Sequence, residues 1–297
     1  MTFGTIQIAE RDAAAAQNVR AVERIVRGIP ANDGAGVRLS RIIGQPGLPD
    51  LDPFLLLDEF RSEEASDYLA GFPDHPHRGF ETVTYMLAGR MRHGDNRGNV
   101  GLLRPGGVQW MTAGRGIVHS EMPEQENGLL WGYQLWVNLP AKDKMTAPRY
   151  QDIAPEAIPT IALDGGVRVK VIAGRVGGHS GPVAGVPTDP TYLDVSLPAG
   201  AAFRHVVPED YTAFAYVIEG GVGVGPEGDG KTVRRGELAV LGLGEAIRVG
   251  ARPSQPARLL LVAGRPLREP IAKYGPFVMN TAAELRRAFE DFRSGRL

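Results

Sequence analysis

Short runs of alternating apolar and polar residues, each closed by glycine or proline, make up most of this chain. The clearest runs are residues 83–87, 132–139, 167–172, 192–197 and 258–263. Successive side chains of a strand point to opposite faces, so this alternation is typical of half-buried strands. Many short strands cut by turn residues predict an all-β fold, a sandwich or a barrel.

One segment near the end of the chain has a helical period instead. Thr281-Ala-Ala-Glu284 has the form of a capping box, in which the first and fourth residues cap each other's backbone. Leu285, Ala288, Phe289 and Phe292 then follow at spacings of three or four residues. This spacing places them on one face of a helix. We therefore predict a C-terminal amphipathic α-helix.

A weak internal repeat suggests that one β-unit is used twice. Tyr85–Gly89 resembles Tyr216–Gly220 at an offset of 131 residues, and later glycine turns recur at nearly the same offset. A length of 297 residues also suits two domains. We place them at residues 1–145 and 146–297, with the helix ending the second domain. The proline-bounded stretch 140–159 is expected to link them.

Composition and charge narrow the function classes. Lys plus Arg is 33 and Asp plus Glu is 34, so a net charge of −1 gives no overall attraction to nucleic acid or anionic membranes. The absence of cysteine excludes disulfides, thiolate metal sites and a cysteine nucleophile. No phosphate-binding loop, dinucleotide fingerprint or nucleophile elbow occurs, so no nucleotide cofactor is expected. Without a leader or an apolar run of ~20 residues, we expect a cytoplasmic protein without a membrane partner.

Two short pairs of metal-ligating residues stand out. Four of the six histidines lie between residues 75 and 119. His75 and His77 are two residues apart, and so are His119 and Glu121. Residues two apart on a strand point to the same face, so each pair offers two ligand atoms to one point. If the two strands adjoin inside a barrel, three imidazoles and one carboxylate converge on a metal ion.

This donor set indicates the kind of metal. A mixture of nitrogen and oxygen donors without thiolate suits a borderline divalent ion. Iron(II) is the first choice, and manganese, nickel, copper(II) and zinc are alternatives. Four protein ligands leave two positions of an octahedral ion open for a substrate oxygen and dioxygen.

Several neighbouring residues are candidates for the rest of the site. Gln134 follows on the next predicted strand and is placed to hydrogen-bond a ligand or bound water. His93 lies between two strands, and either borders the pocket or belongs to a loop. Phe54 either lines an apolar pocket, together with the tryptophans, or is core. In the second repeat His205 has no partner, so that domain is expected to hold no metal; His179 lies in a glycine-rich loop.

The residues around these ligands resemble a known family. Gly71–Val83 is similar to the first motif of the cupin superfamily, and Pro105–Pro123 to the second. Together with Leu51–Phe60, Gln134–Pro140 and Tyr274–Thr281, they resemble the pirin family closely. The resemblance extends from about residue 20 to the end of the chain.

The resemblance implies a fold and a ligand set. Pirins are bicupins, in which two antiparallel jelly-roll β-barrels face each other and the N-terminal barrel holds one iron. The ligands would be His75, His77, His119 and Glu121. Many other cupins use a glutamate of the first motif, here Glu81. Glu81 has the strand parity of His75 and His77, so the sequence leaves it open; we expect it beside the ligands rather than on the metal.

The resemblance also implies two classes of function. Several bacterial pirins are associated with quercetin 2,3-dioxygenase activity, so we expect an iron-dependent oxidoreductase acting on a small flavonol-like substrate and O2. Glu121 would then be both ligand and catalytic base. The alternative is an iron-dependent regulatory protein that binds a protein partner, as a transcriptional or metabolic coregulator, without catalysis. A monomer is expected in either case.

Overall fold

The computed structural model describes residues 18–297, which form two compact units. Of the described residues, unit 1 comprises 18–28 and Ile158–Pro266, and unit 2 comprises Ile29–Ala157 and Leu267–Leu297. Within the described residues no helix is both long and apolar enough to cross a bilayer.

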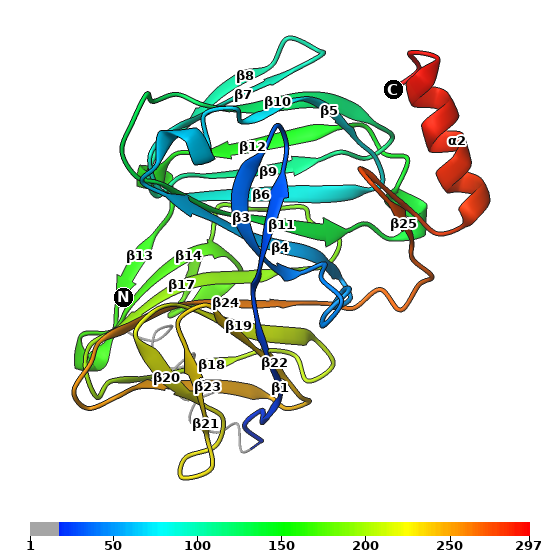
Figure 1. Ribbon diagram of the computed structural model, residues 1–297. Coiled ribbons are helices and arrows are strands. Elements are labelled where there is room, and N and C mark those ends of the chain that lie inside the picture. The colour runs from blue at the N-terminus through cyan, green and yellow to red at the C-terminus, as the bar shows by residue number, and fades with distance from the viewer. Residues whose placement is uncertain (1–17) are drawn as a thin grey trace, which may run out of the picture. The chain divides into compact units, whose positions relative to one another are not determined.

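Unit 2 is built from two antiparallel sheets (Figure 1). The seven-stranded sheet has the order β12-β9-β6-β11-β4-β3-β2 and the four-stranded sheet the order β5-β10-β7-β8. The strands of the larger sheet are β2 (Ile29–Asp33), β3 (Val37–Ile43), β4 (Phe54–Ser62), β6 (Phe80–Ala88), β9 (Val108–Thr112), β11 (Leu130–Asn138) and β12 (Arg149–Ile153). Those of the smaller sheet are β5 (Phe72–His77), β7 (Met91–Asp95), β8 (Val100–Leu103) and β10 (Ile117–Pro123). Short 3-10 turns η1 (Ala65–Asp67), η2 (Ala141–Asp143) and η3 (Pro155–Ala157) connect strands.

Unit 1 repeats this arrangement. Its seven-stranded sheet has the order β1-β22-β19-β24-β17-β14-β13 and its four-stranded sheet the order β18-β23-β20-β21. The larger sheet contains β1 (Val22–Arg27), β13 (Thr160–Ala162), β14 (Arg168–Ala173), β17 (Thr191–Leu197), β19 (Thr212–Glu219), β22 (Glu237–Leu241) and β24 (Ala257–Gly264). The smaller contains β18 (Ala202–Val206), β20 (Gly221–Val224), β21 (Lys231–Arg234) and β23 (Ala246–Ala251). The turn η4 (Asp164–Gly166) and a two-stranded ribbon, β15 (Arg175–Val176) and β16 (His179–Ser180), complete the unit.

The internal repeat of the sequence is visible in this topology. Tyr85 lies on β6 and Tyr216 on β19, and both strands occupy the third position of their seven-stranded sheets. All five strands expected from alternation are present, with end points shifted by at most a few residues. The strand pattern was therefore a sound guide to the all-β architecture.

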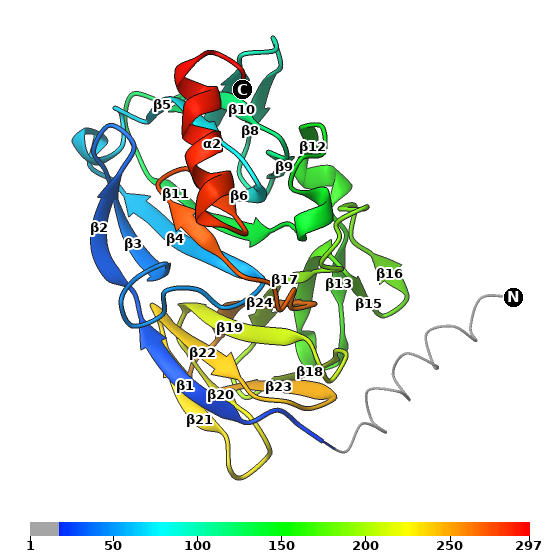
Figure 2. The same cartoon turned by 90° about the vertical axis from the view of Figure 1, so that its right-hand side faces the viewer.

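The sequence suggested a single domain boundary at residue 145, but each unit of the structure is made from two separate segments of the chain. The N-terminal strand β1 pairs with β22 and completes the larger sheet of unit 1 (Figure 2). The supposed linker, residues 140–159, contains β12, which pairs with β9 inside unit 2. Each unit thus includes one terminal segment of the chain, an exchange that a single boundary cannot describe. Pairing between segments far apart in the sequence leaves no local pattern that would predict it.

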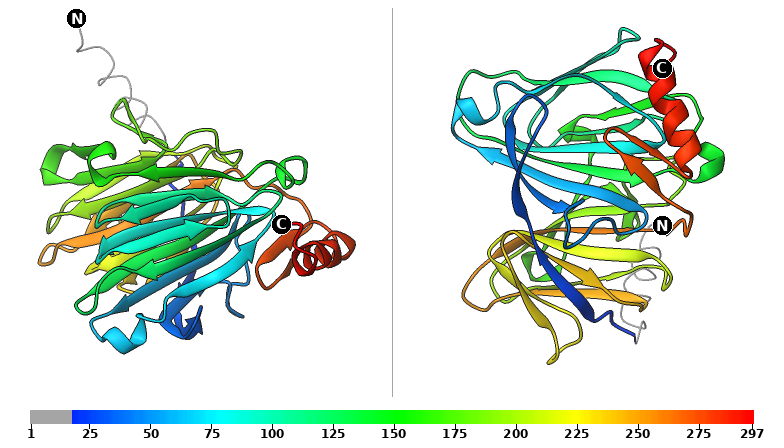
Figure 3. Two further views of the ribbon diagram at one scale, coloured as in Figure 1. Left: turned by 90° about the horizontal axis from the view of Figure 1, so that it is seen from above. Right: turned by 45° about the vertical axis from the view of Figure 1, so that its right-hand side comes forward.

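The predicted C-terminal helix is present as α2 (Ala282–Arg293). Its capping box forms as expected: the Thr281 hydroxyl accepts from the Glu284 amide at 3.2 Å, and the Glu284 carboxylate accepts from the Thr281 amide at 2.8 Å. The helix packs beside the hairpin of β25 (Ala272–Tyr274) and β26 (Phe277–Met279) in unit 2 (Figure 3). Asp291 of the helix also pairs with the buried Arg78 at 2.8 Å. These contacts attach the last segment of the chain to unit 2.

The interiors of the two units differ in character. A large cluster of buried valine, leucine, isoleucine and alanine side chains, with Phe203, fills unit 1. The cluster between the sheets of unit 2 is smaller, and polar side chains such as Thr84, His119 and Glu121 are buried in this unit. The buried potential metal ligands of the two strand motifs therefore lie in unit 2.

Candidate metal centre

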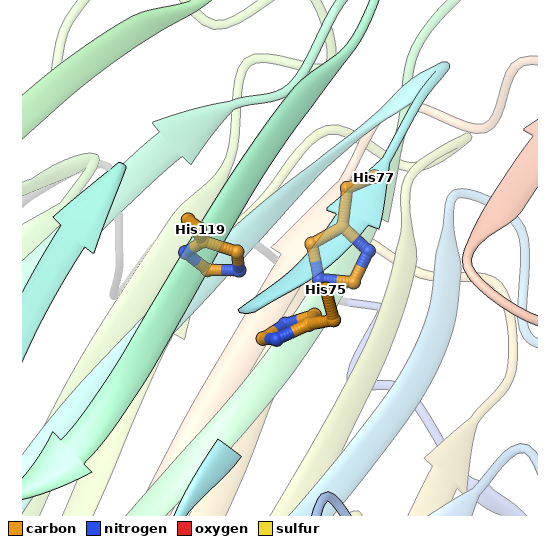
Figure 4. Close-up of side chains that lie close together, drawn as sticks. All are labelled: His75, His77 and His119. Carbon is orange, nitrogen blue, oxygen red and sulfur yellow. The ribbon is translucent and has the colours of Figure 1, made fainter. Parts of the chain in front are cut away.

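Three histidines converge on one point of unit 2. His75 and His119 are directly opposite each other on the paired strands β5 and β10, and His77 follows two residues after His75 on the same face. Figure 4 shows the three imidazoles grouped together. One ring nitrogen of each lies within 4.8 Å of those of the other two. The two spacing motifs thus bring distant histidines together.

The electrostatics of these histidines favour metal ligation. His77 and His119 are buried, and burial lowers the pKa of each well below the ordinary value, with further lowering from neighbouring histidines. Nδ1 of His77 and both ring nitrogens of His119 have no hydrogen-bond partner among the described residues. Neutral imidazoles with free lone pairs are the form that binds metals, and unpartnered buried nitrogens need a ligand. The donor set therefore fits a divalent metal ion.

His75 has its ring orientation fixed from outside the cluster. Its Nδ1 lies 2.8 Å from the carbonyl oxygen of Pro73. A carbonyl accepts, so Nδ1 carries the proton and Nε2 keeps its lone pair. Such a partner sets the tautomer and aims the other nitrogen at the metal.

Glu121 lies in the same pocket but outside the 4.8 Å histidine cluster. A register shift between His119 and Glu121 interrupts the pairing of β10 with β5. Such bulges redirect side chains. The carboxylate lies 2.9 Å from the Thr84 hydroxyl and 3.4 Å from Nε2 of Gln134, which belong to the opposite sheet. Glu121 is thus held between the two sheets.

The neighbours of Glu121 were found only in part from the sequence. Gln134 lines the pocket, and its Nε2 can donate to the Glu121 carboxylate. Thr84 was missed, although it is directly opposite Gln134 on β6. Thr84 lies in a long, mostly buried strand, where the sequence does not distinguish it from a core residue. Only its pairing with Gln134 indicates a role in the site.

His93 is neither a loop residue nor a pocket residue. It lies on β7, directly opposite Glu121 on β10, and is buried. Its Nδ1 is 3.5 Å from the Glu121 carboxylate, while burial lowers its pKa despite that charge. The glycine and charged residues around it resembled a turn in the sequence. The hairpin turn begins only after this strand ends.

Phe54 and the three tryptophans divide between pocket and core. Phe54 is fully buried and does not line the pocket, and Trp110 and Trp131 are likewise buried outside it. Trp136 does line the pocket, with its ring centroid 5.3 Å from that of His77. Of these four residues, Trp136 alone lines the pocket next to the histidines.

Glu81 lies on the other face of its strand from the site. Its carboxylate accepts from the Thr112 hydroxyl at 2.7 Å, whereas Thr84, three residues later, contacts Glu121. Strand parity with the histidines fails because β5 ends at His77 and β6 begins at Phe80, in a different sheet. Gly79, between them, has a φ of +89°, a conformation that suits glycine at this bend.

The pocket has a volume of about 780 Å³, within the range of small-molecule sites. His75, His77, Glu121 and Gln134 lie in its wall, with apolar side chains that include Leu56, Phe60, Phe72 and Trp136. Arg41, Asp58 and Lys273 add charge elsewhere in the wall. A pocket of this volume and lining can hold a flat aromatic ligand.

Unit 1 places different residues at the equivalent strand pair. His205 on β18 is opposite Ile247 on β23, in the arrangement that sets His75 opposite His119 in unit 2. Burial lowers the pKa of His205 to about 4, and its ring stacks on Phe203 at 6.0 Å. His179 is exposed on β16. The second motif of ligands is thus replaced by apolar residues.

Comparisons with known proteins agree with this architecture. The Pirin family model matches residues 36–137, and the Pirin C-terminal cupin domain model matches residues 192–297. A pirin-like protein of Caulobacter vibrioides is 55% identical over 94% of this chain and 99% of its own. Pirin of Homo sapiens is 45% identical over 89% of each chain. The crystal structure of quercetin 2,3-dioxygenase from Acinetobacter baumannii has a TM-score of 0.84 and 35% identity, covering 94% of this chain and 98% of that one. Two cupin-type domains, the motifs around the histidines and these matches together show that the chain belongs to the pirin family.

Proposed function

We propose that this protein is a metal-dependent dioxygenase of the quercetin 2,3-dioxygenase type. The observation that carries the proposal is a cluster of three histidines, two of which lie with Glu121 in the wall of an aromatic-lined pocket. The chain is also similar over nearly its whole length to a protein whose crystal structure is described as quercetin 2,3-dioxygenase, which supports the same chemistry.

The metal would be iron(II), held by His75, His77, His119 and Glu121. When bound, such an ion supplies the acidification of a substrate hydroxyl and the activation of dioxygen. The three imidazoles leave coordination positions free on a six-coordinate ion even with Glu121 included. Manganese, nickel, copper(II) and zinc are alternatives that the loading experiment below tests separately.

Other side chains of the pocket would accept the substrate proton, orient the base and bind the substrate rings. Glu121 accepts the proton of the substrate hydroxyl, because its carboxylate lies beside the cluster and lines the pocket. Thr84 and Gln134 orient that carboxylate through their contacts at 2.9 and 3.4 Å. Trp136 and Phe72 pack against the substrate rings and exclude water.

Oxygen uptake with quercetin tests the proposal. Metal-free protein is loaded anaerobically with each candidate metal in turn, and uptake is followed after quercetin and oxygen are added. We expect uptake with iron(II) and none in the His119→Ala variant. Bound iron without uptake would contradict the proposal and favour the regulatory role, in which the iron oxidation state alters binding of a protein partner.

A further inference from the structure

A row of polar residues crosses the pocket wall away from the histidines. Arg41 on β3 is directly opposite Asp58 on β4, Asp58 is opposite Gln134 on β11, and Gln134 is opposite Thr84 on β6. Directly opposite residues of antiparallel strands share a face, so this row lies on one face of the seven-stranded sheet. With strands ~4.8 Å apart, the backbones of Arg41 and Gln134 are roughly 10 Å apart. A three-ring ligand can bridge that span.

Arg41 is fixed in place but keeps its Nη1 amino group free to donate. Its Nε and Nη2 donate to the two oxygens of Asp58 at 3.0 and 2.7 Å, and Nη2 also donates to Asp33 at 2.7 Å. Nη1 has no hydrogen-bond partner within the part of the chain that the structure describes. The Asp58 side chain is 5% exposed and that of Arg41 23%, so the pair is held from below while the guanidinium is still accessible.

Asp33 adds an acceptor next to this donor. Its side chain is 52% exposed and lines the same pocket. Its oxygens accept from the Gly34 amide and from Arg41, and each carboxylate oxygen can accept a second hydrogen bond. The nearby Lys273 is already engaged, because its Nζ donates to the carbonyl oxygens of Pro49 and Leu55 at 3.0 and 3.2 Å.

A free donor beside a free acceptor is the complement of a hydroxyl group, which both accepts and donates one hydrogen bond. We propose that Arg41 and Asp33 form a subsite for a phenolic hydroxyl on the substrate ring furthest from the histidines. A carboxylate in that place would lie beside two acidic side chains, Asp33 and Asp58, so we expect the subsite to bind it less tightly than a hydroxyl. This inference rests on the proposed function for its substrate class.

Ligand binding without turnover tests the subsite. Anaerobic, iron-loaded protein is titrated with 3-hydroxyflavone and with its derivatives bearing one more hydroxyl at position 7 or 4′. Binding is followed by quenching of the intrinsic tryptophan fluorescence, to which Trp136 in the pocket wall contributes. At least one derivative should bind about tenfold more tightly than the parent, the size expected for a hydrogen bond to a charged group. The analogue with a carboxylate at that position should not share this gain.

Substitutions of Asp33 and Arg41 test whether these two residues cause the tighter binding of the hydroxylated derivative. Asp33→Asn and the double variant Arg41→Gln/Asp58→Asn should each remove most of it and leave 3-hydroxyflavone binding unchanged; the double change avoids leaving Asp58 buried and unpaired. Arg38→Gln is the matched control, because Arg38 is on the same strand but 73% exposed. No gain in the wild type, or equal losses for parent and derivative, would overturn the subsite. Selective binding without oxygen uptake would sustain it while refuting the dioxygenase.

Discussion

The Thr84 hydroxyl lies 2.9 Å from Oε1 of Glu121, although the two residues belong to different sheets of unit 2. The same hydroxyl is 2.6 Å from the Gln134 side chain, so its single proton can go to only one of the two at a time. Glu121 therefore depends on an outside residue for its orientation. This relationship makes Thr84 a positioning residue for the candidate base.

Thr84→Val should slow turnover about tenfold with little change in bound metal, because the isosteric change removes one hydrogen bond to Glu121 and no donor of the histidine cluster. Turnover and metal content are measured on the same preparation. Thr84→Ser should restore most of the activity, since it retains the hydroxyl. Equal activity of the valine and serine variants would show that the hydroxyl does not matter.

Glu121→Gln should reduce turnover at least a hundredfold while lowering metal content much less. The amide keeps the size of the side chain and leaves three histidines for the metal, but it cannot accept the substrate proton. Elemental analysis and oxygen uptake give the two quantities. Proportional losses of metal and activity would leave Glu121 with the role of a ligand alone.

Single alanine variants of His75, His77 and His119 should each lose most of the bound metal, because the remaining donors no longer surround the ion. His179→Ala is the matched control, since His179 is exposed on β16 of unit 1. Bound metal is measured by elemental analysis after dialysis against metal-free buffer. Full metal content in the His119 variant would place the metal elsewhere.

Glu81 should make stability depend on pH. Burial raises the pKa of Glu81 from its ordinary value of 4.5 to about 7, although the hydrogen bond from Thr112 opposes the shift. Between these two values the folded protein holds more protons than the unfolded chain, so stability falls as pH rises through that window. The loss reaches at most about 3 kcal/mol above the folded pKa.

Glu81→Gln removes that titration. Relative to the wild type, the variant should gain free energy of unfolding as pH rises from 4.5 to 7, because only the wild type must bury a charge there. Urea unfolding at several pH values measures the difference. Parallel pH profiles for the two proteins would mean that Glu81 is not protonated more readily in the folded state.

Asp291→Asn should destabilise unit 2 by about 3 kcal/mol, because it leaves the guanidinium of Arg78 buried without its carboxylate. The Arg78 side chain is only 4% exposed, and its other listed acceptor is the carbonyl oxygen of Arg115. Urea unfolding measures the effect, with Glu290→Gln on the exposed side of the same helix as control. A change no larger than in the control would show that the pair contributes little.

Local patterns predicted the elements and the histidine cluster well, but not what lies across strands. The two-residue spacings of His75 with His77 and of His119 with Glu121 survive in the structure because each pair lies on one strand. For Glu81, the sequence argument assumed that it shares a strand with His75 and His77. It lies on β6, a strand of the other sheet, so the alternation of side chains does not extend to it. Thr84 and the Arg41 row depend on register between strands, which a single sequence does not state.

The placement of α2 was unpredictable for a related reason. The capping box and the apolar stripe specify a helix but not its partner. That partner includes Arg78, which the chain reaches more than 200 residues earlier. Long-range pairs of this kind are fixed by tertiary packing.

The exchange of terminal segments has a consequence for how the protein is made. During synthesis on the ribosome, β1 emerges first but must wait for β22 before its backbone groups are paired. Unit 2, although mostly translated early, lacks its last hairpin and helix until Leu267–Leu297 has been made. All of unit 1 is therefore translated before unit 2 can be completed, although most of unit 2 precedes most of unit 1 in the chain.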